Sequence, residues 1–437
     1  MLKDLMDGSI GRFWADVGHL GSCEESMPGF VRLADDGDHL LLDLLAPGGV
    51  PAESRFPLPR SITATTSAGG ALFLDVRGVR GASTLGGYRV ATRTYRAGAV
   101  VFGVQLPDLL SDEFREVTAF FPGVGRWAGL AGSKATPTTD EQGRMTGFSL
   151  STQAATTQSE QLGRGRTLGM STHWEVQGPE DRQTLYAPVS FSVASERPAD
   201  WSDLIQPLLS VQGLISLAYD GLVLADGGRA TIDLRKPPLE GPKWWTARLM
   251  QRPRGARIPR APTEIPTFFL QTLGGMAGVR RWVGLTRRYP RATGPLLSRH
   301  RYGDVNVETQ LLEIAAGIEY WVTVHRRTRQ WANRKSGQGG YAGALAAWVG
   351  APFANLVGDP DAWARRFWTT YGLLKHQPNG RYDGYEVSLL AGCGAVLLEC
   401  ALLNRAARTA APARAICDSH RHVSLGARMR ELLGIET

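Results

Sequence analysis

The spacing of apolar residues changes along this chain, and that change limits the folds it can adopt. In the front part, apolar residues alternate with other residues over short runs such as 88–94 and 187–193, bounded by Gly-rich turns. Alternation is typical of half-buried strands. After the Pro- and Arg-rich stretch 253–262, the spacing becomes helical. The sequence therefore predicts an α+β protein, with a β-rich, sandwich-like N-terminal domain at 1–258 and an all-α domain at 259–437.

Individual elements follow from the same patterns. Runs at 39–45 and 71–79 predict strands, and 244–250 predicts the last strand of the front domain. A helix is predicted near 201–215 despite Pro207, and the polar segment 132–145 is predicted to be a loop. In the back part, apolar stripes predict helices over 269–282, 307–321, 363–374, 386–408 and 423–434. Asp359 followed by Pro360 is a good helix start.

Charge divides the chain as sharply as periodicity does. Residues 1–246 hold 22 Lys and Arg against 28 Asp and Glu, a net charge of −6, whereas residues 247–437 hold 27 against 13, a net charge of +14. Between 247 and 358, sixteen of the 17 basic residues are Arg. Arg suits bidentate phosphate contacts and stacking on bases. The imbalance indicates a polyanion-binding half, although an Arg-rich solvated surface gives the same count.

Several classes of protein lack their motifs here. We find no GxxxxGK[ST] loop, no HExxH and no paired CxxC, so a P-loop NTPase of the usual form is excluded and we expect no cofactor and no metal. Four cysteines cannot form a disulfide framework. Because the first eight residues have no apolar signal-like core and no apolar run reaches the length of a membrane span, we expect a cytoplasmic protein without a membrane partner.

Two histidines, His376 and His325, are candidates for a catalytic or phosphate-binding role. His376 closes the predicted 363–374 helix ahead of turn residues, where it is a candidate general acid or base, or else a plain helix-terminal His. His325 is followed by Arg326, Arg327 and Arg329, a run that suits either phosphate contact or simple solvation.

Three stretches resemble ApeA-type HEPN proteins, a bacterial antiphage (abortive-infection) family. They are FREVTAFFPGVGRW at 114–127, the strand, acidic linker and helix of 185–219, and the helical region 299–376. The resemblance implies a helical HEPN domain that dimerises and acts as a metal-independent ribonuclease. In that chemistry the RNA 2′-OH attacks the adjacent phosphodiester, a His moves protons and an Arg stabilises the developing charge.

The family motif, Arg-Asn followed a few residues later by His, is degenerate here. Counting back from His376, Tyr371 stands at the Arg position and Gly372 at the Asn position. Arg365 and Arg366 lie 11 and 10 residues upstream, roughly 15 Å away along a continuous helix. Arg381, just after the turn, has room to fold back.

The resemblance and the residues leave three functional interpretations open. The first is a ribonuclease with a rearranged site, with His376, Arg366 and Arg381 as catalytic candidates and Arg326, Arg327, Arg329 and Arg365 as RNA contacts. The second is a catalytically degenerate HEPN protein that binds RNA or a protein partner without cleaving. The third is a structural helical dimer module. The β-rich domain would sense a phage product or restrain the helical domain. Across these interpretations the expected partners are RNA, for the first two, and a phage-derived trigger, and the expected assembly is a homodimer through the helical domain.

Overall fold

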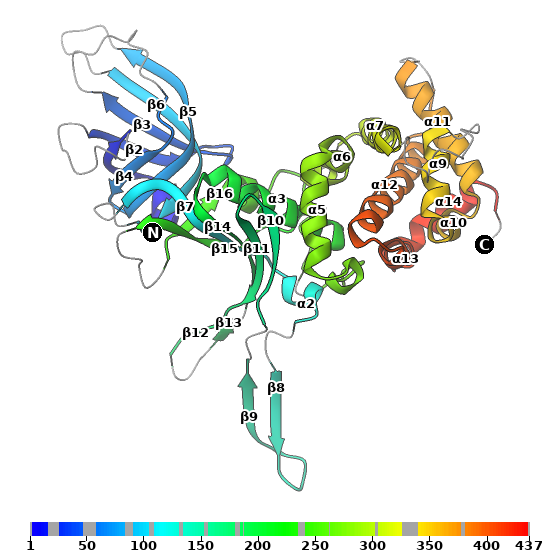
Figure 1. The fold of residues 1–437 in the computed structure, drawn as a ribbon, viewed down its shortest axis with the longest axis horizontal. Helices are drawn as coiled ribbons and strands as arrows, with labels where there is room; N and C mark the ends of the chain where they lie inside the picture. Colours follow the sequence, from blue (N-terminus) through cyan, green and yellow to red (C-terminus); the bar gives the residue numbers. More distant parts are fainter. Residues whose placement is uncertain are drawn as a thin grey trace.

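The N-terminal strands close into a six-stranded antiparallel barrel in the computed structural model (Figure 1). Leu40, Leu42 and Leu44 point into its interior and are completely buried, while the residues between them face outward. The strand order is β6-β3-β2-β1-β4-β5, and β5 pairs with β6 to close the ring. The strands are β1 (Ser9–Trp14), β2 (Met27–Leu33), β3 (Leu40–Ala46), β4 (Ile62–Thr66), β5 (Gly69–Ser83) and β6 (Ala91–Phe102), and the short helix α1 (Leu2–Asp7) packs against them.

The structure describes most of the chain. The described residues are 2–15, 26–46, 58–83, 91–104, 109–130, 134–152, 156–179, 184–186, 188–234, 241–261, 263–301, 305–325, 340–376 and 381–435.

A second stretch of antiparallel sheet continues from β6 and covers the helix α3 (Trp201–Ala218). Its order beyond β6 is β16-β15-β7-β14-β11-β10. Nearly every apolar residue of α3 is buried, which explains why Pro207 is tolerated within it. The elements are β7 (Leu109–Phe120), α2 (Val124–Ala128), β10 (Gln158–Gly163), β11 (Arg166–Thr172), β14 (Val189–Ala199), β15 (Gly227–Leu234), β16 (Lys243–Thr246) and α4 (Ala247–Met250).

Two predicted elements of the β-rich half differ from the structure. The expected loop 132–145 instead contains β8 (Lys134–Thr139), which pairs with β9 (Met145–Ser151) in an exposed hairpin. Asp140 closes its turn by accepting hydrogen bonds from the backbone of Gln142 and Arg144, each at 2.9 Å. The expected strand 244–250 ends at Thr246, where α4 begins. A second small hairpin is formed by β12 (Glu175–Gln177) and β13 (Thr184–Tyr186).

The back of the chain is helical, as predicted, and is organised around α12 (Gly384–Ala407). Among the described helices α12 alone is long and apolar enough to span a membrane, but 83% of its apolar window is buried inside the protein, as in a soluble core helix. The remaining elements are η3 (Leu270–Leu273), α5 (Met276–Arg288), α6 (Pro290–Arg301), α7 (Val307–His325), α9 (Gly340–Val349), α10 (Ala351–Val357), α11 (Pro360–His376), α13 (Ala411–Cys417) and α14 (Val423–Leu432).

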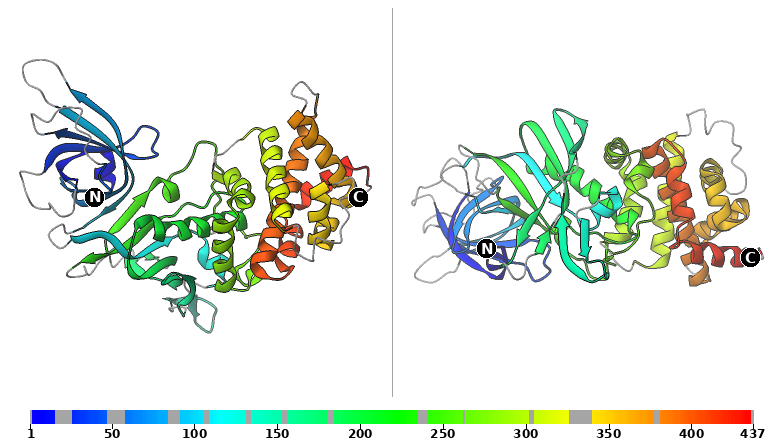
Figure 2. Two further views of the ribbon diagram at one scale, coloured as in Figure 1. Left: turned by 45° about the horizontal axis from the view of Figure 1, so that its top comes forward. Right: turned by 90° about the horizontal axis from the view of Figure 1, so that it is seen from below.

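The barrel and the helical bundle lie at opposite ends of the molecule, with α3 and α5 between them (Figures 1 and 2). One hydrophobic core runs from the second stretch of sheet through α3 into the helices, across the predicted boundary at 258/259. Trp282 of α5 is completely buried there, and its indole N–H donates to the backbone oxygen of Ser210 at 2.9 Å. The α+β class is confirmed, with a closed barrel in its β-rich part.

Candidate functional site

The end of α11 carries the histidine that the sequence singled out. Asp359 caps the helix, accepting from the backbone N–H groups of Asp361 and Ala362 at 3.0 and 2.9 Å. His376 is the last residue of α11 and is exposed. Its imidazole is therefore open to solvent, as a group that exchanges protons with a substrate must be.

Tyr371, at the motif position for Arg, belongs to the core of this helix. It is 8% exposed and its ring lies 5.0 Å from that of Trp368. Lys375 donates to the Tyr371 hydroxyl at 3.1 Å, and this hydrogen bond raises the pKa of Lys375. At Gly372, by contrast, an added Cβ would meet no atom within 4 Å. Tyr371, at the first motif position, is therefore a packed core residue, whereas a side chain at the second position, Gly372, would face open space.

The structure does not bring Arg366 and His376 together. The guanidinium of Arg366 makes a bidentate pair with Glu386 of α12, with Nε–Oε1 and Nη2–Oε2 distances of 2.6 and 2.8 Å. It also donates to the Leu432 carbonyl at 3.2 Å, and the hydrogen bonds from Glu386 raise its pKa. This arginine thus joins three helices of the bundle.

The other predicted arginines divide into two groups. Arg365 and Arg381 are exposed, and Arg365 donates to the backbone oxygen of Asp361 at 3.3 Å. Arg326, Arg327 and Arg329 lie outside the described residues.

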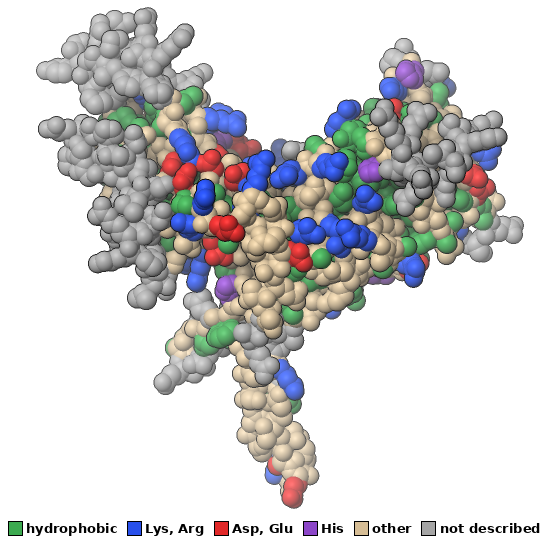
Figure 3. Space-filling view, viewed as in Figure 1, with side chains coloured by type: hydrophobic (Ala, Val, Ile, Leu, Met, Phe, Trp, Pro, Cys, Tyr) green, Lys and Arg blue, Asp and Glu red, His purple; other side chains and the backbone are tan. Residues whose placement is uncertain are grey.

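A different concentration of charge lies in a groove of about 1580 Å³ where the sheet, α3, α5, α6 and the end of α12 meet. We call it the arginine groove. Figure 3 shows Lys and Arg side chains gathered across the middle of this face, and acidic ones toward the β-rich end. Among the residues that the structure describes, one carboxylate lines the groove, Asp203. Ten arginines line it: Arg164, Arg166, Arg248, Arg280, Arg281, Arg287, Arg288, Arg301, Arg405 and Arg408.

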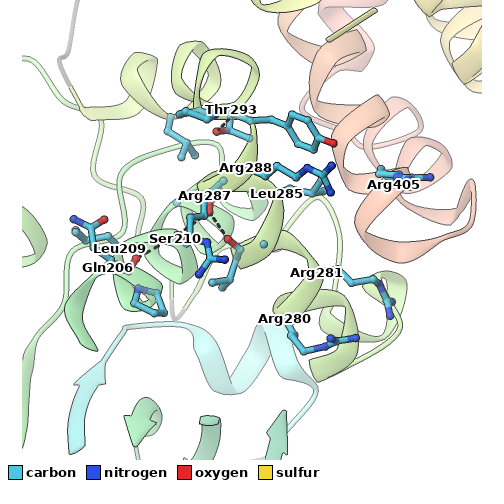
Figure 4. A pocket seen from close by; sticks show the side chains of 18 of the residues that line it. Gln206, Leu209, Ser210, Arg280, Arg281, Leu285, Arg287, Arg288, Thr293 and Arg405 are labelled. Atoms are coloured by element: carbon cyan, nitrogen blue, oxygen red, sulfur yellow. Dashed lines mark hydrogen bonds between the residues drawn. The ribbon is translucent and has the colours of Figure 1, made fainter. Parts of the chain in front are cut away.

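Helix α5 lines the arginine groove and supplies four of its ten arginines (Figure 4). Arg280 and Arg281 lie near its start and Arg287 and Arg288 at its end, seven residues further on. Seven residues correspond to about 10 Å along a helix, or two turns. Both pairs therefore point from the same side of α5, because seven residues return nearly to the same face.

The first pair lies beside the end of α12. The Arg281 Nε donates to the Ala406 carbonyl, and Arg408 follows directly after the helix. Burial, together with the positive charges of Arg408 and Arg280, lowers the pKa of Arg281. Arg280 is partly balanced by Glu160 of β10, whose Oε2 lies 3.2 Å from its Nε. The guanidinium groups of Arg280, Arg281 and Arg408 thus lie close together. Among the described residues one carboxylate, that of Glu160, faces them.

The second pair lies beside an aromatic cluster. Arg288 extends over the ring of Tyr289, with 5.4 Å between its Cζ and the ring centroid, and Arg405 projects from α12 nearby (Figure 4). Tyr289 packs edge-on against Trp321, whose ring centroid lies 4.0 Å from that of His325 with the two rings tilted by 48°. Burial lowers the pKa of His325, and Arg405 and Arg288 add to that effect. Aromatic rings beside cations are a common arrangement for binding nucleotides.

Polar groups fix the floor of the arginine groove. Arg301 donates to the side-chain oxygen of the buried Gln212 at 2.7 Å. Gln212 in turn donates to the carbonyls of Val223 and Leu249, at 2.9 Å each. His300, almost completely buried beside them, has a pKa lowered well below its usual value by burial. The floor of the groove is therefore formed by side chains that hydrogen-bond or pack within the protein itself.

Below the floor, Arg299 joins the two halves of the molecule. Its Nη2 lies 3.0 Å from the Asp220 carboxylate and 3.7 Å from that of Glu399. Glu399 is completely buried in α12, and burial raises its pKa to about 8. We take Glu399 to be mainly protonated at neutral pH, since 3.7 Å exceeds hydrogen-bonding distance and Arg299 is already paired with Asp220.

Within the described part of the chain, no group of three or more His, Cys, Asp or Glu is arranged to hold a metal ion. The groove's chemistry is that of Arg side chains, which bind phosphate and carboxylate groups with paired N–H donors.

Sequence reasoning missed the arginine groove because its arginines come from elements spread between residues 164 and 408. A partial signal was available. The Arg-Arg pairs at 280–281 and 287–288 repeat at a seven-residue interval, which places both on one helix face.

The fold and the groove together define an α+β protein with an arginine-lined groove where its β-rich and helical parts meet. The family model described as ApeA N-terminal domain 1 matches residues 8–269, more than half of the chain, and the match ends just before η3. The chain therefore belongs to the ApeA family, a family of antiphage defence. Neither the curated proteins nor the solved structures contain a match to it.

Proposed function

We propose that this chain is an antiphage defence protein that binds RNA in the arginine groove. One observation carries the proposal: ten arginines converge there from both halves of the chain, with one lining carboxylate among the described residues. Holding like charges together costs stability, and such clusters are typical of binding sites. The backbone of RNA supplies one negative charge per nucleotide, which relieves that repulsion.

Membership of the ApeA family supports the biological setting. The helical region is compatible with a HEPN domain, and the resemblance in 299–376 led to the expectation of RNA. We further propose a cytoplasmic homodimer that forms through the helical region and responds to a phage-derived trigger.

The direct test is fluorescence anisotropy with a labelled RNA of about 20 nucleotides. Wild type should bind with an affinity that falls steeply with salt, because phosphate contacts release counterions. Arg288→Glu combined with Arg405→Glu should weaken binding about 100-fold or more, since each hydrogen bond to a charged group contributes roughly 1.5–3 kcal/mol.

The matched control is Arg428→Glu, which changes an exposed arginine of α14 outside the groove. It should bind RNA within about twofold of wild type, as a screened surface charge would. Equal losses in the control and in the groove variant would contradict the proposal.

A second candidate function is metal-independent RNA cleavage, and the exposure of His376 at the end of α11 favours it. Because Arg366 is bound by Glu386, the charge-stabilising group would have to be another residue, with Arg381 as the candidate. Total bacterial RNA should be cleaved in EDTA by wild type and not by His376→Ala. RNA that is bound but left intact by both proteins would favour the catalytically degenerate form.

A further inference from the structure

Two residues of the arginine groove have an unusual backbone conformation. Arg164 lies in the left-handed region with φ of 57°, and Arg408 does so with φ of 64°. Among the described residues other than glycine, only four have positive φ, and the other two are Asp75 and Asp220. Asp is among the residues that tolerate this region, whereas a long side chain such as Arg is disfavoured there.

Both positions are ones where glycine is the common choice. Arg164 is the middle of the Gly163-Arg164-Gly165 turn between β10 and β11, and its two neighbours also have positive φ. Arg408 is the C-cap of α12, a position at which a left-handed residue is usually Gly. The chain therefore keeps Arg at two sites where the backbone conformation favours Gly.

The side-chain contacts within the protein do not explain this choice. Both arginines are exposed, and within the described ranges neither guanidinium makes a hydrogen bond or an ion pair. Both line the same groove, Arg164 from the turn between β10 and β11 and Arg408 from the end of α12. Strained residues held without a structural reason are typical of binding sites.

The order of the elements places this turn and this helix end on the two sides of α5. Strand β10 packs on α5, and its Glu160 reaches Arg280. On the other side α5 packs against α12, where Arg281 donates to Ala406. Arg164 and Arg408 thus flank the helix that carries the two arginine pairs.

The dimensions of the groove limit what fits between the walls. Its volume of about 1580 Å³ exceeds the roughly 300–1,000 Å³ typical of small-molecule pockets. The arginine pairs of α5 are about 10 Å apart, a length that spans roughly three phosphates of a stacked strand at about 3.4 Å each. Double-stranded RNA is instead contacted across its minor groove over roughly 16 base pairs, which requires a long open surface.

We propose that the arginine groove is a clamp for a single RNA strand. In this clamp Arg164 from the β-rich half and Arg408 from the helical half bind phosphates of the RNA on either side of α5. This inference rests on the proposed function, since it specifies the form of RNA that the groove takes. It also gives the β-rich half a direct part in RNA binding.

The experiment uses the full chain with Arg164→Gly, Arg408→Gly and the double variant. Glycine suits both backbone conformations, so each variant should melt at the wild-type temperature or higher. Each should lower the slope of log affinity against log salt by about 0.7, the value for one phosphate contact on a single strand, and the double variant by about 1.4.

Two controls separate charge from backbone effects. Asp75→Gly makes the same kind of backbone change on β5 of the barrel, and should leave the salt slope unchanged. Arg408→Lys keeps both the charge and the disfavoured conformation, and should keep most of the slope.

The outcomes distinguish this inference from the proposed function. If the double variant binds RNA with the wild-type salt slope, the clamp is wrong and RNA binding stands. If a duplex of the same sequence binds as tightly as the single strand, the single-strand specificity is wrong. If wild type binds no RNA, the proposed function fails and the clamp fails with it.

Discussion

The end of α11 and the arginine groove both concentrate basic residues, but they use them differently. At α11, Arg366 is bound by Glu386, and Lys375 is bound by Tyr371. In the groove, Arg287, Arg288, Arg405 and Arg408 have no carboxylate partner among the described residues, and one acid, Asp203, lines the wall. Basic groups that already have partners hold a fold together, whereas basic groups without partners are available to a ligand.

The largest expected difference between the two regions is in RNA affinity. Charge reversal at Arg365 of α11 and at Arg381, which follows that helix, should change the affinity by less than about threefold, whereas reversal at Arg288 and Arg405 should lower it about 100-fold. Anisotropy titrations of both double variants at one salt concentration make the comparison. A larger loss from the α11 pair would reverse the assignment of the two regions.

The next effect exchanges side chains between the regions. Tyr371→Arg, which restores the family residue, should lower the free energy of unfolding by about 2 kcal/mol or more, because it places a charge at a buried position beside Lys375. The reverse exchange, Arg288→Tyr, should change it by about 0.5 kcal/mol or less, since Arg288 is exposed. Urea denaturation of both variants measures the difference. Equal losses in the free energy of unfolding would show that the two positions tolerate the exchange equally and would contradict this prediction.

A third effect depends on pH and concerns the floor beneath the groove. Native Glu399 keeps its proton up to a pKa of about 8, whereas the unfolded chain loses it near 4.5. The unfolding free energy should therefore fall as pH rises between these values, by up to about 1.4 kcal/mol per unit. Glu399→Gln should remove that dependence between pH 6 and pH 7 and leave RNA affinity at pH 7 unchanged. An identical pH slope in wild type and variant would mean that Glu399 is ionised.

The smallest effect tests the role of Arg366. Because its guanidinium is partly exposed, Arg366→Ala should cost only about 1 kcal/mol of stability, and it should not alter RNA affinity. Arg405→Ala should do the opposite, weakening RNA binding without a change in stability. Thermal melts and anisotropy on the same two proteins give both readings, and a loss of RNA affinity in Arg366→Ala would return this residue to the list of site residues.

Local patterns in the sequence were enough to predict most of the helical half. The cap at Asp359 and the stripe over 363–374 correspond to α11, and the apolar run near 386–408 corresponds to α12. Burial of one helix face leaves a periodic trace in the sequence. The hairpin of β8 and β9 left none, because both of its faces are exposed and its residues are mostly small and polar.

The arginine groove depends on tertiary structure that no local pattern records. Arg164, Arg281 and Arg408 lie more than a hundred residues apart in sequence and meet only once β10, α5 and α12 have packed. The closure of the barrel was likewise out of reach, since it depends on which strands pair. What the sequence did reveal was the sum of the charges, the net +14 beyond residue 246.

The groove's dispersed origin has a consequence for synthesis on the ribosome. Arg164 is translated 244 residues before Arg408, an interval of roughly 10–50 s at 5–20 residues per second. During that time the β-rich half has emerged and the wall carried by α12 does not yet exist. A growing chain thus has no complete clamp until α12 has been translated, although it is tethered next to ribosomal and messenger RNA throughout that time.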